Sequence, residues 1–151
     1  MTTQRQDGTD LSGIHLWLLL WKASRAVEAH SSRSIARFEM GTSDFGVLEA
    51  LLHKGPLTVK QIGEKVLLTS GSMTTAVDRL ERRGLVARCD DPTDRRAKII
   101  RLTDAGQELI SRAFAEHRAA MEQAVEGFSE ADRAELMPLL RRLGKAAAGN
   151  L

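Results

Sequence analysis

The sequence predicts a mainly α-helical fold that carries one small β-hairpin. Apolar residues recur at helical spacing through most of the 151 residues, which is typical of amphipathic helices. Only residues 85–88 and 98–102 form short runs rich in Leu, Val and Ile that resemble strands. A chain of this length has room for one domain with a hydrophobic core, so we expect a single domain over residues 11–148.

Two helices are expected before the first strong break in the chain. Residues 1–10 are polar and lack apolar periodicity, so we expect a mobile tail there. A long apolar repeat predicts a helix over residues 11–38, which Gly41 is expected to stop, and a second stripe predicts a helix over residues 43–53. Gly55-Pro56 then ends this part of the chain, because both residues interrupt regular structure.

The next segment has the pattern of a helix-turn-helix, two short helices joined by a tight connection. Thr58 and Gln61 are spaced as a capping box, in which two side chains satisfy N–H groups at the start of a helix. Ser70 or Ser72 is placed to cap the second helix, and Gly84 is placed to end it. The inward face of this second helix is expected to hold Met73, Val77 and Leu80.

Two strands and two helices complete the predicted order. The strand-like runs enclose a polar loop at residues 90–96, so we expect a hairpin that projects as a wing. Thr103 is expected to cap a long helix that extends to about residue 127, and Ser129 a last helix that extends to about residue 148. Four helices, two strands and two helices form a winged helix-turn-helix with additional helices at both ends.

The second helix of the pair has the composition of a helix that enters the major groove of DNA. With its apolar face turned inward, it presents glycine, hydroxyl and charged residues to solvent. Those at the centre and margins of this face are Gly71, Ser72, Thr74, Thr75, Asp78, Arg79 and Arg82. Short side chains near the helix N-terminus allow a close approach of phosphates, which the helix dipole favours. Arg79 and Arg82 have the length to reach a guanine edge or a phosphate.

The predicted wing offers a second contact with DNA. Arg95 and Arg96 lie at a tip that Pro92 holds out, where arginines can enter the narrow minor groove. Asp94 is close enough in sequence to orient one of these arginines through a bidentate pair. We therefore expect the wing to bind DNA beside the recognition helix.

The distribution of charge indicates a basic surface on a nearly neutral protein. The formal net charge is only +2, so composition alone does not identify a nucleic-acid binder. Basic residues are nevertheless concentrated in one segment: Arg79, Arg82, Arg83, Arg88, Arg95, Arg96, Lys98 and Arg101. Each feature has an ordinary alternative, since arginines can be solvated surface, hydroxyls can be caps and charged loops can be plain turns. Their occurrence together, in this order, favours DNA binding.

These segments resemble one known family, the multiple-antibiotic-resistance regulator (MarR) family of winged helix-turn-helix proteins. The matching segments are Leu57–Gly63, Thr69–Leu80, Arg83–Val86, Asp91–Arg96 and Leu102–Gly106. The Asp-Pro-x-Asp-Arg-Arg pattern of the wing is the most specific of them. The helix pattern outside this block agrees as well, so the resemblance covers about residues 11–148.

The resemblance implies a homodimeric, sequence-specific transcription regulator that binds pseudo-palindromic double-stranded DNA. Residues 42–102 would form the DNA-binding lobe, and residues 11–39 and 104–148 the dimerisation helices. The family pattern places the DNA contacts on the recognition helix and the wing, at Ser70, Ser72, Thr74, Thr75, Arg79, Arg95 and Arg96. It further implies a repressor that a small phenolic or anionic effector releases from DNA, with no cofactor.

Ligand contacts are less well defined by the sequence. Trp17 and Trp21 are one helical turn apart and can line a pocket for an aromatic effector; packing in a core or a dimer interface is the interpretation we favour. Cys89, the single cysteine, permits a thiol-based redox sensor as an alternative. Its neighbour Arg88 favours a reactive thiolate, whereas Asp90 and Asp91 oppose one, so we favour an incidental thiol.

Other classes of protein have little support in the sequence. The four histidines are scattered, and no His or Cys pair has metal-ligand spacing, so we predict no metal site. We find no catalytic constellation and predict that the protein is not an enzyme. A winged-helix domain that binds an acidic protein partner is the alternative to a DNA-binding regulator.

The single cysteine, with no signal peptide and no membrane-length apolar run, leads us to expect a cytoplasmic protein.

Overall fold

The computed structural model of the protein describes residues 10–66 and 70–151, so residues 1–9 of the predicted tail lie outside the described part. The elements in chain order are α1 (Gly13–Ala36), α2 (Thr42–Lys54), β1 (Leu57–Thr58), α3 (Val59–Val66), α4 (Ser70–Arg82), β2 (Val86–Asp90), β3 (Lys98–Leu102), α5 (Asp104–Ala124) and α6 (Glu130–Gly149). Helices with a small antiparallel sheet are the fold class that the sequence predicts, and this prediction is confirmed.

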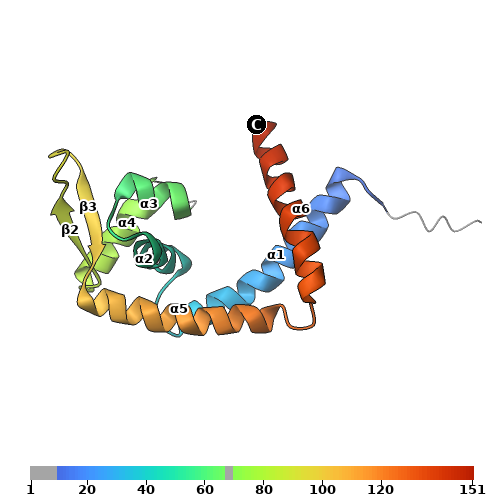
Figure 1. Ribbon diagram of the computed structural model, residues 1–151, viewed down its shortest axis with the longest axis horizontal. Helices are drawn as coiled ribbons and strands as arrows, with labels where there is room; N and C mark the ends of the chain where they lie inside the picture. The colour runs from blue at the N-terminus through green and yellow to red at the C-terminus, as the bar shows by residue number, and fades with distance from the viewer. Residues whose placement is uncertain (1–9, 67–69) are drawn as a thin grey trace, which may run out of the picture.

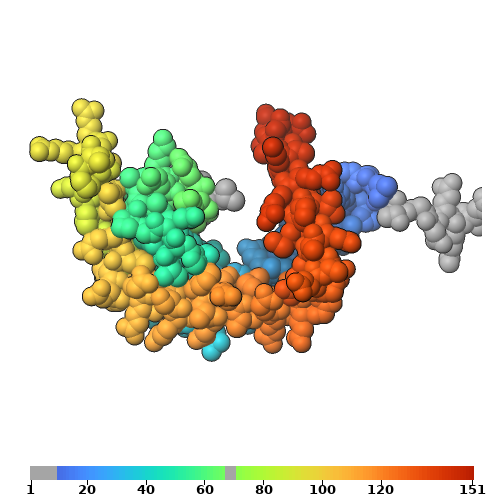
Figure 2. Space-filling view, in the orientation of Figure 1, coloured from blue at the N-terminus to red at the C-terminus, as the bar shows by residue number. Residues whose placement is uncertain are grey.

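The molecule has a lobe at one end and a pair of long helices at the other (Figure 1). The lobe contains α2, α3, α4 and the wing strands, whereas α1 and α6 lie together away from it. Helix α5 extends from the sheet to the α6 end and packs along α1. The space-filling view shows an open notch between the lobe and α6 (Figure 2).

Side-chain caps fix the starts of α3, α5 and α6 where the sequence predicts them. Thr58 Oγ1 accepts from the N–H of Gln61 at 3.2 Å, and Gln61 Oε1 accepts from the N–H of Thr58 at 2.9 Å, which completes the predicted capping box at α3. Thr103 caps α5, and Ser129 forms a capping box at α6. Gly84 follows α4 with a φ of 70°, the left-handed conformation that favours glycine.

Two predicted helix boundaries are wrong. Helix α1 ends at Ala36, before a turn in which Glu39 has a φ of 55°. Gly41 therefore does not stop α1 and instead occupies the N-cap position of α2. Ser72 lies inside α4, which begins at Ser70, so it is not the cap of that helix.

The sheet contains a third strand that the sequence analysis missed. In β1, Leu57 is the register partner of Ile100 and Thr58 that of Ile99, so β3 lies between β1 and β2. A strand of two residues has no periodicity to detect, and here it overlaps the capping box of α3. Strand β2 also extends to Asp90, beyond the predicted end at residue 88.

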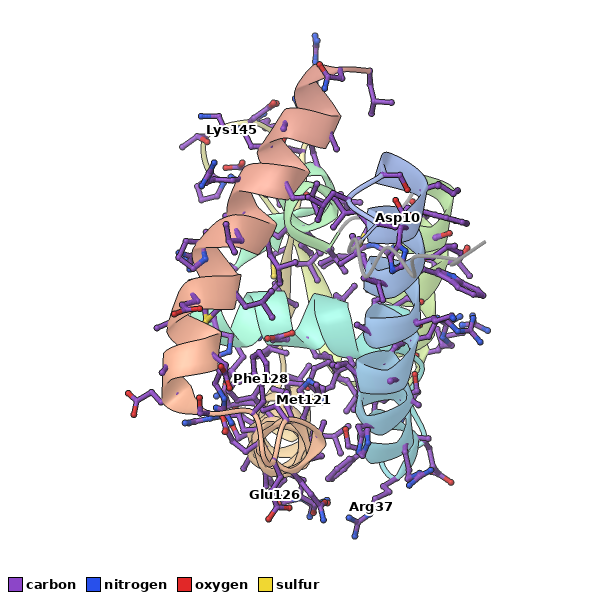
Figure 3. The ribbon with its side chains drawn as sticks, turned by 90° about the vertical axis from the view of Figure 1, so that its right-hand side faces the viewer. Asp10, Arg37, Met121, Glu126, Phe128 and Lys145 are labelled. Atoms are coloured by element: carbon purple, nitrogen blue, oxygen red, sulfur yellow. The ribbon has the colours of Figure 1, made fainter. Side chains whose placement is uncertain are left out.

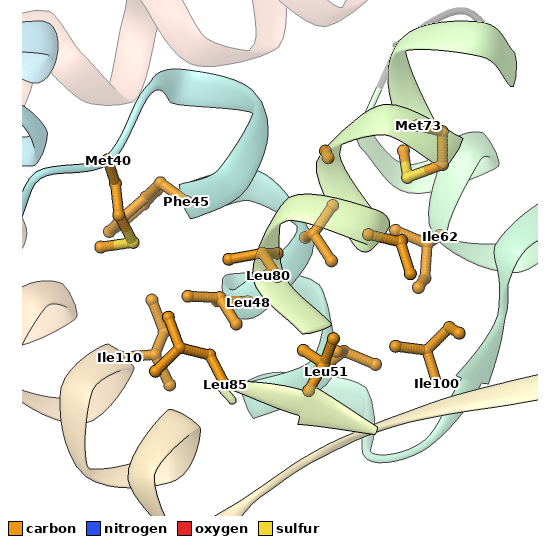
Figure 4. Packing of buried hydrophobic residues seen from close by; sticks show 14 of the residues in the cluster. Met40, Phe45, Leu48, Leu51, Ile62, Met73, Leu80, Leu85, Ile100 and Ile110 are labelled. Carbon is orange, nitrogen blue, oxygen red and sulfur yellow. The ribbon is translucent and has the colours of Figure 1, made fainter. Parts of the chain in front are cut away.

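The hydrophobic core lies inside the lobe and against the lobe end of α5 (Figure 4). The predicted inward face of α4 is confirmed, since Met73, Val77 and Leu80 are buried. They pack with residues from α2, α3, β3 and α5, among them Leu48, Ile62, Ile100 and Ile110. The core therefore fixes one face of α4 and leaves the opposite face at the protein surface.

The helices at the other end expose their apolar residues. In the view of Figure 3, α1 and α6 run side by side above α5. An apolar groove of about 430 Å³ lies between them, lined by Leu16, Leu19, Leu20, Ala23, Ser24, Val27, Leu136, Leu140 and Leu143. Monomeric proteins rarely expose a continuous apolar surface of this kind. The α1–α6 end therefore has the character of an interface.

Candidate nucleic-acid interface

The exposed face of α4 carries small and hydroxyl-bearing residues. Gly71, Ser72, Thr74 and Thr75 are exposed, whereas Met73 one helical position away is fully buried. Ser70 begins the helix, but its side chain lies outside the described part of the structure. The core thus orients α4 so that the predicted DNA-reading residues face away from the lobe.

Thr75 uses its hydroxyl hydrogen within α4. Its Oγ1 donates to the carbonyl oxygen of Gly71 at 3.0 Å. In this rotamer the hydroxyl oxygen is available as an acceptor, for example to an amino group on a base edge. A donated bond to a phosphate requires the hydroxyl to leave Gly71.

Arg79 is bound to a buried carboxylate. Its Nε donates to both carboxylate oxygens of Asp44, at 3.1 Å and 2.9 Å, and its Nη2 lies 2.5 Å from Asp44 Oδ1. Asp44 is only 3% exposed. The hydrogen bonds and the charge of this carboxylate raise the pKa of Arg79 above its ordinary value. Arg79 therefore connects α4 to the first turn of α2, and its predicted contact with DNA remains a prediction.

Arg83, the residue after α4, makes a second connection between the end of that helix and the segment before α2. Its Nη1 donates to the carbonyl oxygen of Glu39 at 2.9 Å. Glu39 is the residue in the turn after α1 that has a positive φ. The C-terminal half of α4 is thus attached through arginines to the junction between α1 and α2.

A further arginine attaches α4 to the wing. Arg88 of β2 donates through Nη2 to Asp78 Oδ1 at 2.5 Å, and through Nη1 to the carboxylate of Glu81. The hydrogen bond to Asp78 is the main reason that the pKa of Arg88 is raised. Asp78, which the sequence places on the outward face of α4, is therefore paired with the first wing strand.

Main-chain hydrogen bonds shape the wing tip. Asp91 Oδ1 accepts from the N–H and the hydroxyl of Thr93, both at 2.8 Å. Asp94 Oδ1 accepts from the N–H of Arg96 at 2.9 Å. The expectation that Asp94 orients an arginine side chain is therefore wrong, because its carboxylate binds the backbone of the turn. Arg95 and Arg96 are both exposed at the tip.

The two tryptophans lie on α1 beside the apolar groove. Trp17 and Trp21 are about half exposed, and their rings stack with centroids 6.2 Å apart and planes 15° apart. The structure thus places them together on one strip of α1 at the surface, not in the core of the lobe. Their predicted role in an effector pocket remains a prediction.

Cys89 has a different neighbour from the one that the sequence suggests. Its Sγ accepts a hydrogen bond from Arg101 Nε at 3.2 Å. Arg88 instead points to the opposite face of the sheet, because consecutive residues of a strand alternate between faces.

The described part of the chain contains no cluster of His, Cys, Asp or Glu that can hold a metal ion. None of the described helices combines the length and hydropathy that a membrane crossing requires.

Known proteins share this arrangement and much of the sequence. A family model described as the MarR family matches residues 39–97, which include α4 and the tip of the wing. The HTH-type transcriptional regulator MhqR of Bacillus subtilis is 35% identical over 131 residues, which cover 87% of this chain and 90% of that protein. The chain belongs to the MarR family.

Solved structures of MarR-family proteins agree with this assignment. Sco3205 of Streptomyces coelicolor, described as a MarR family transcriptional regulator in complex with DNA, superposes with a TM-score of 0.81 at 26% identity and covers 93% of this chain and 94% of its own. A cysteine-to-serine mutant of MarR from E. coli, solved with operator DNA, has the same fold, with a TM-score of 0.79 at 19% identity and coverage of 86% and 94%. As a MarR-family member, the protein is a transcriptional regulator that binds DNA and not an enzyme.

The ion pairs that orient α4 have no signal in the sequence. Asp44 has the position of an ordinary acidic residue in the first turn of a helix, where its negative charge interacts favourably with the helix dipole. Its partner Arg79 is 35 residues away, and no local pattern links the two. The Arg88 bridge to Asp78 and Glu81 follows only after the strand is placed against α4.

Proposed function

We propose that the protein is a homodimeric repressor that binds a pseudo-palindromic operator through α4 and the wing, and that a small aromatic or anionic effector releases it. The observation that carries this proposal is the exposed hydroxyl-bearing face of α4 beside a wing that ends in Arg95 and Arg96. Helix and wing lie next to each other at the same end of the molecule (Figure 1).

The proposed major-groove contacts come from the N-terminal half of α4. Short hydroxyl side chains let the helix backbone approach phosphates, and its N-terminus attracts them. Ser70, Ser72, Thr74 and Thr75 form this group. Arg79 at the margin of the same face adds a guanidinium that Asp44 already orients, which is favourable for recognition of a guanine edge. Arg95 and Arg96 enter the minor groove beside it.

The proposed dimer uses the α1–α6 end. Apolar residues line a groove between these helices, and further large apolar side chains such as Leu18, Met137 and Leu139 are exposed around it. A second copy of the chain covers such a surface through a two-fold axis, which makes the same patch contact itself. The axis then presents two α4 helices to half-sites about 10 bp apart. In this arrangement residues 42–102 bind DNA, and residues 11–39 and 104–148 form the dimer.

Effector release follows from a shift between two arrangements of the lobes. An effector that binds the DNA-incompetent arrangement more tightly weakens operator binding, and a 10- to 100-fold effect requires about 1.4–2.7 kcal/mol of coupling. We place the aromatic contact for this effector at Trp17 and Trp21, whose stacked rings are accessible on α1.

Operator binding tests the proposal directly. A duplex is first selected by the wild-type protein from a random-sequence library, and its affinity is then measured by fluorescence anisotropy. We expect Arg95→Ala/Arg96→Ala to lower the affinity about 10- to 100-fold, with a smaller dependence on salt because fewer phosphate contacts release counterions. Arg112→Ala, an exposed substitution on α5, is the control. Equal affinities of the wing variant and the wild type contradict the wing contact.

A further inference from the structure

Arg88 joins the wing to the recognition helix at two points. Its Nη2 lies 2.5 Å from Asp78 Oδ1, and its Nη1 donates to the carboxylate of Glu81. The two carboxylates are one helical turn apart on α4, and therefore neighbours on one helix face. Only 28% of the Arg88 side chain is exposed, which is less than for either carboxylate. Because the planar guanidinium is held at both terminal nitrogens, it fixes the orientation of β2 relative to α4 as well as the distance between them.

The position of Arg88 in the sheet explains why it reaches α4. It is the register partner of Ile100, which is fully buried, so its side chain points to the core face of the sheet. Arg101 lies on the opposite face, where it contacts Cys89. Arg88 is thus the arginine of the wing strands that connects the hairpin to the helix.

The direction of the wing tip depends on how the base of the hairpin is attached, because the tip projects beyond the sheet. Beyond the pair of Asp90 with Lys98, the hairpin continues only as a turn. Strand β3 pairs with β1 on its other side, whereas β2 is at the edge of the sheet and packs against α4, so the direction of the hairpin depends on that packing. Arg95 and Arg96 follow shortly after Arg88 in the chain, so a tilt at the base moves the tip.

We propose that Arg88 is a positioning residue for DNA binding: it sets the wing relative to α4, so that both reach their grooves at once. Both carboxylates of this bridge are partly exposed, so we expect its contribution to stability to be small and its effect on DNA binding to come from geometry. The inference rests on the proposed function in one respect, since it requires the wing to contact DNA.

A double-mutant cycle tests this role, because contact with DNA and positioning of that contact are coupled. Operator affinity is measured for the wild type, Arg88→Met, Arg95→Ala/Arg96→Ala and the combined variant, on the selected duplex. In the wild-type background we expect Arg95→Ala/Arg96→Ala to lower operator affinity about 10- to 100-fold. This loss of affinity is the wing effect. In the Arg88→Met background we expect the double alanine substitution to lower operator affinity less than about 3-fold, since the wing no longer reaches the groove.

A second variant breaks the bridge from the other side. Asp78→Ala/Glu81→Ala removes two negative charges, whereas Arg88→Met removes one positive charge. The two variants change the attraction to DNA in opposite directions. A loss of the wing effect in both therefore cannot arise from charge. Arg101→Met is the matched control, because it removes an arginine from the other face of the same hairpin; in that background the wing effect stays at its wild-type value.

The outcomes are distinguishable from those of the proposed function. A wing effect that is equal in the wild type and in Arg88→Met overturns the positioning role and leaves the proposed function intact. A wild-type protein in which the wing arginines contribute nothing overturns both. Circular dichroism and thermal melting of each variant establish that the folded state is compared; the Asp78→Ala/Glu81→Ala variant decides the question if Arg88→Met does not fold.

Discussion

The guanidinium of Arg79 holds the buried carboxylate of Asp44 with two of its nitrogens. Nε lies 2.9 Å from Asp44 Oδ2, and Nη2 lies 2.5 Å from Oδ1. Asp44 belongs to the first turn of α2, and Arg79 to the C-terminal part of α4. The pair therefore fixes the recognition helix to a helix that contacts both α4 and α5.

The first prediction concerns the stability that this pair provides. Removal of one partner of a buried pair leaves an uncompensated charge and typically costs about 3–5 kcal/mol. Because Arg79 itself is partly exposed, we expect Arg79→Met to lower the free energy of unfolding by less than that range, by about 2–3 kcal/mol. Urea denaturation monitored by circular dichroism measures the change.

The double variant is the control for this interpretation. In Arg79→Met/Asp44→Ala the buried charge is absent, so we expect part of the lost stability to return, although the charge at the α2 N-terminus is lost as well. A double variant that is less stable than Arg79→Met by the full cost of a second independent substitution would falsify the view that the two residues act as a pair.

The sequence identifies the features of this fold that depend on local patterns. The capping box of Thr58 and Gln61, the buried face of α4 and the turn at Gly84 all follow from residues a few positions apart, and the structure confirms each of them. The exposed wing arginines follow from the turn-forming loop in the same way. The periodicity and the turn chemistry of a single segment were sufficient for these predictions.

Features that depend on pairing between distant segments were not predicted. β1 exists only because Leu57 pairs with Ile100, and a segment of two residues has no pattern of its own. The carboxylate of Asp94 was expected to bind an arginine side chain, yet the compact turn brings the N–H of Arg96 to it first. The basic character of Arg88 was evident in the sequence, but its partner was not. The proposed positioning role follows only from the sheet, which places Arg88 against Asp78.

The second prediction concerns the close approach of α5 to the chain before β2. A Cβ atom added to Gly106 would overlap with the carbonyl oxygen of Leu85, which in the native fold accepts from the N–H of Thr103. Backbone cannot move aside as a flexible side chain does, so we expect Gly106→Ala to destabilise the fold by about 1–3 kcal/mol or more. Gly63→Ala in α3 has open space around its added Cβ. In that control we expect a gain of roughly 0.5–1 kcal/mol in urea denaturation, and a similar gain at Gly106 would contradict the overlap.

The third prediction concerns the proposed dimer interface. Leu20 and Leu140 line the apolar groove from opposite sides, on α1 and α6. A charge buried there without a partner is strongly unfavourable, so we expect Leu20→Glu and Leu140→Glu each to convert the dimer to monomer at micromolar concentration. Sedimentation velocity measures the change, with Lys60→Ala, an exposed substitution in the lobe, as a control that remains dimeric. A wild-type protein that sediments as a monomer contradicts the proposed dimer.

The last prediction concerns the pH dependence of the wing tip. Hydrogen bonds from the N–H and hydroxyl of Thr93 stabilise the ionised carboxylate of Asp91, chiefly the one from the backbone, and they lower its pKa below the ordinary value. A carboxyl group whose pKa is lower in the folded state stabilises that state above the unfolded-state pKa, and this contribution disappears as the pH falls through the folded-state pKa. We therefore expect the turn to keep its geometry throughout the neutral range and to loosen only in acid.

In an NMR titration, the Asp91 carboxyl and the Thr93 amide should shift together, at lower pH than Asp91 in an unstructured peptide of the same sequence. Thr93→Ala retains the backbone donor and should bring back only part of the difference. If Asp91 titrates at the peptide value, these hydrogen bonds do not hold the tip, and the presentation of Arg95 and Arg96 depends on the strands alone.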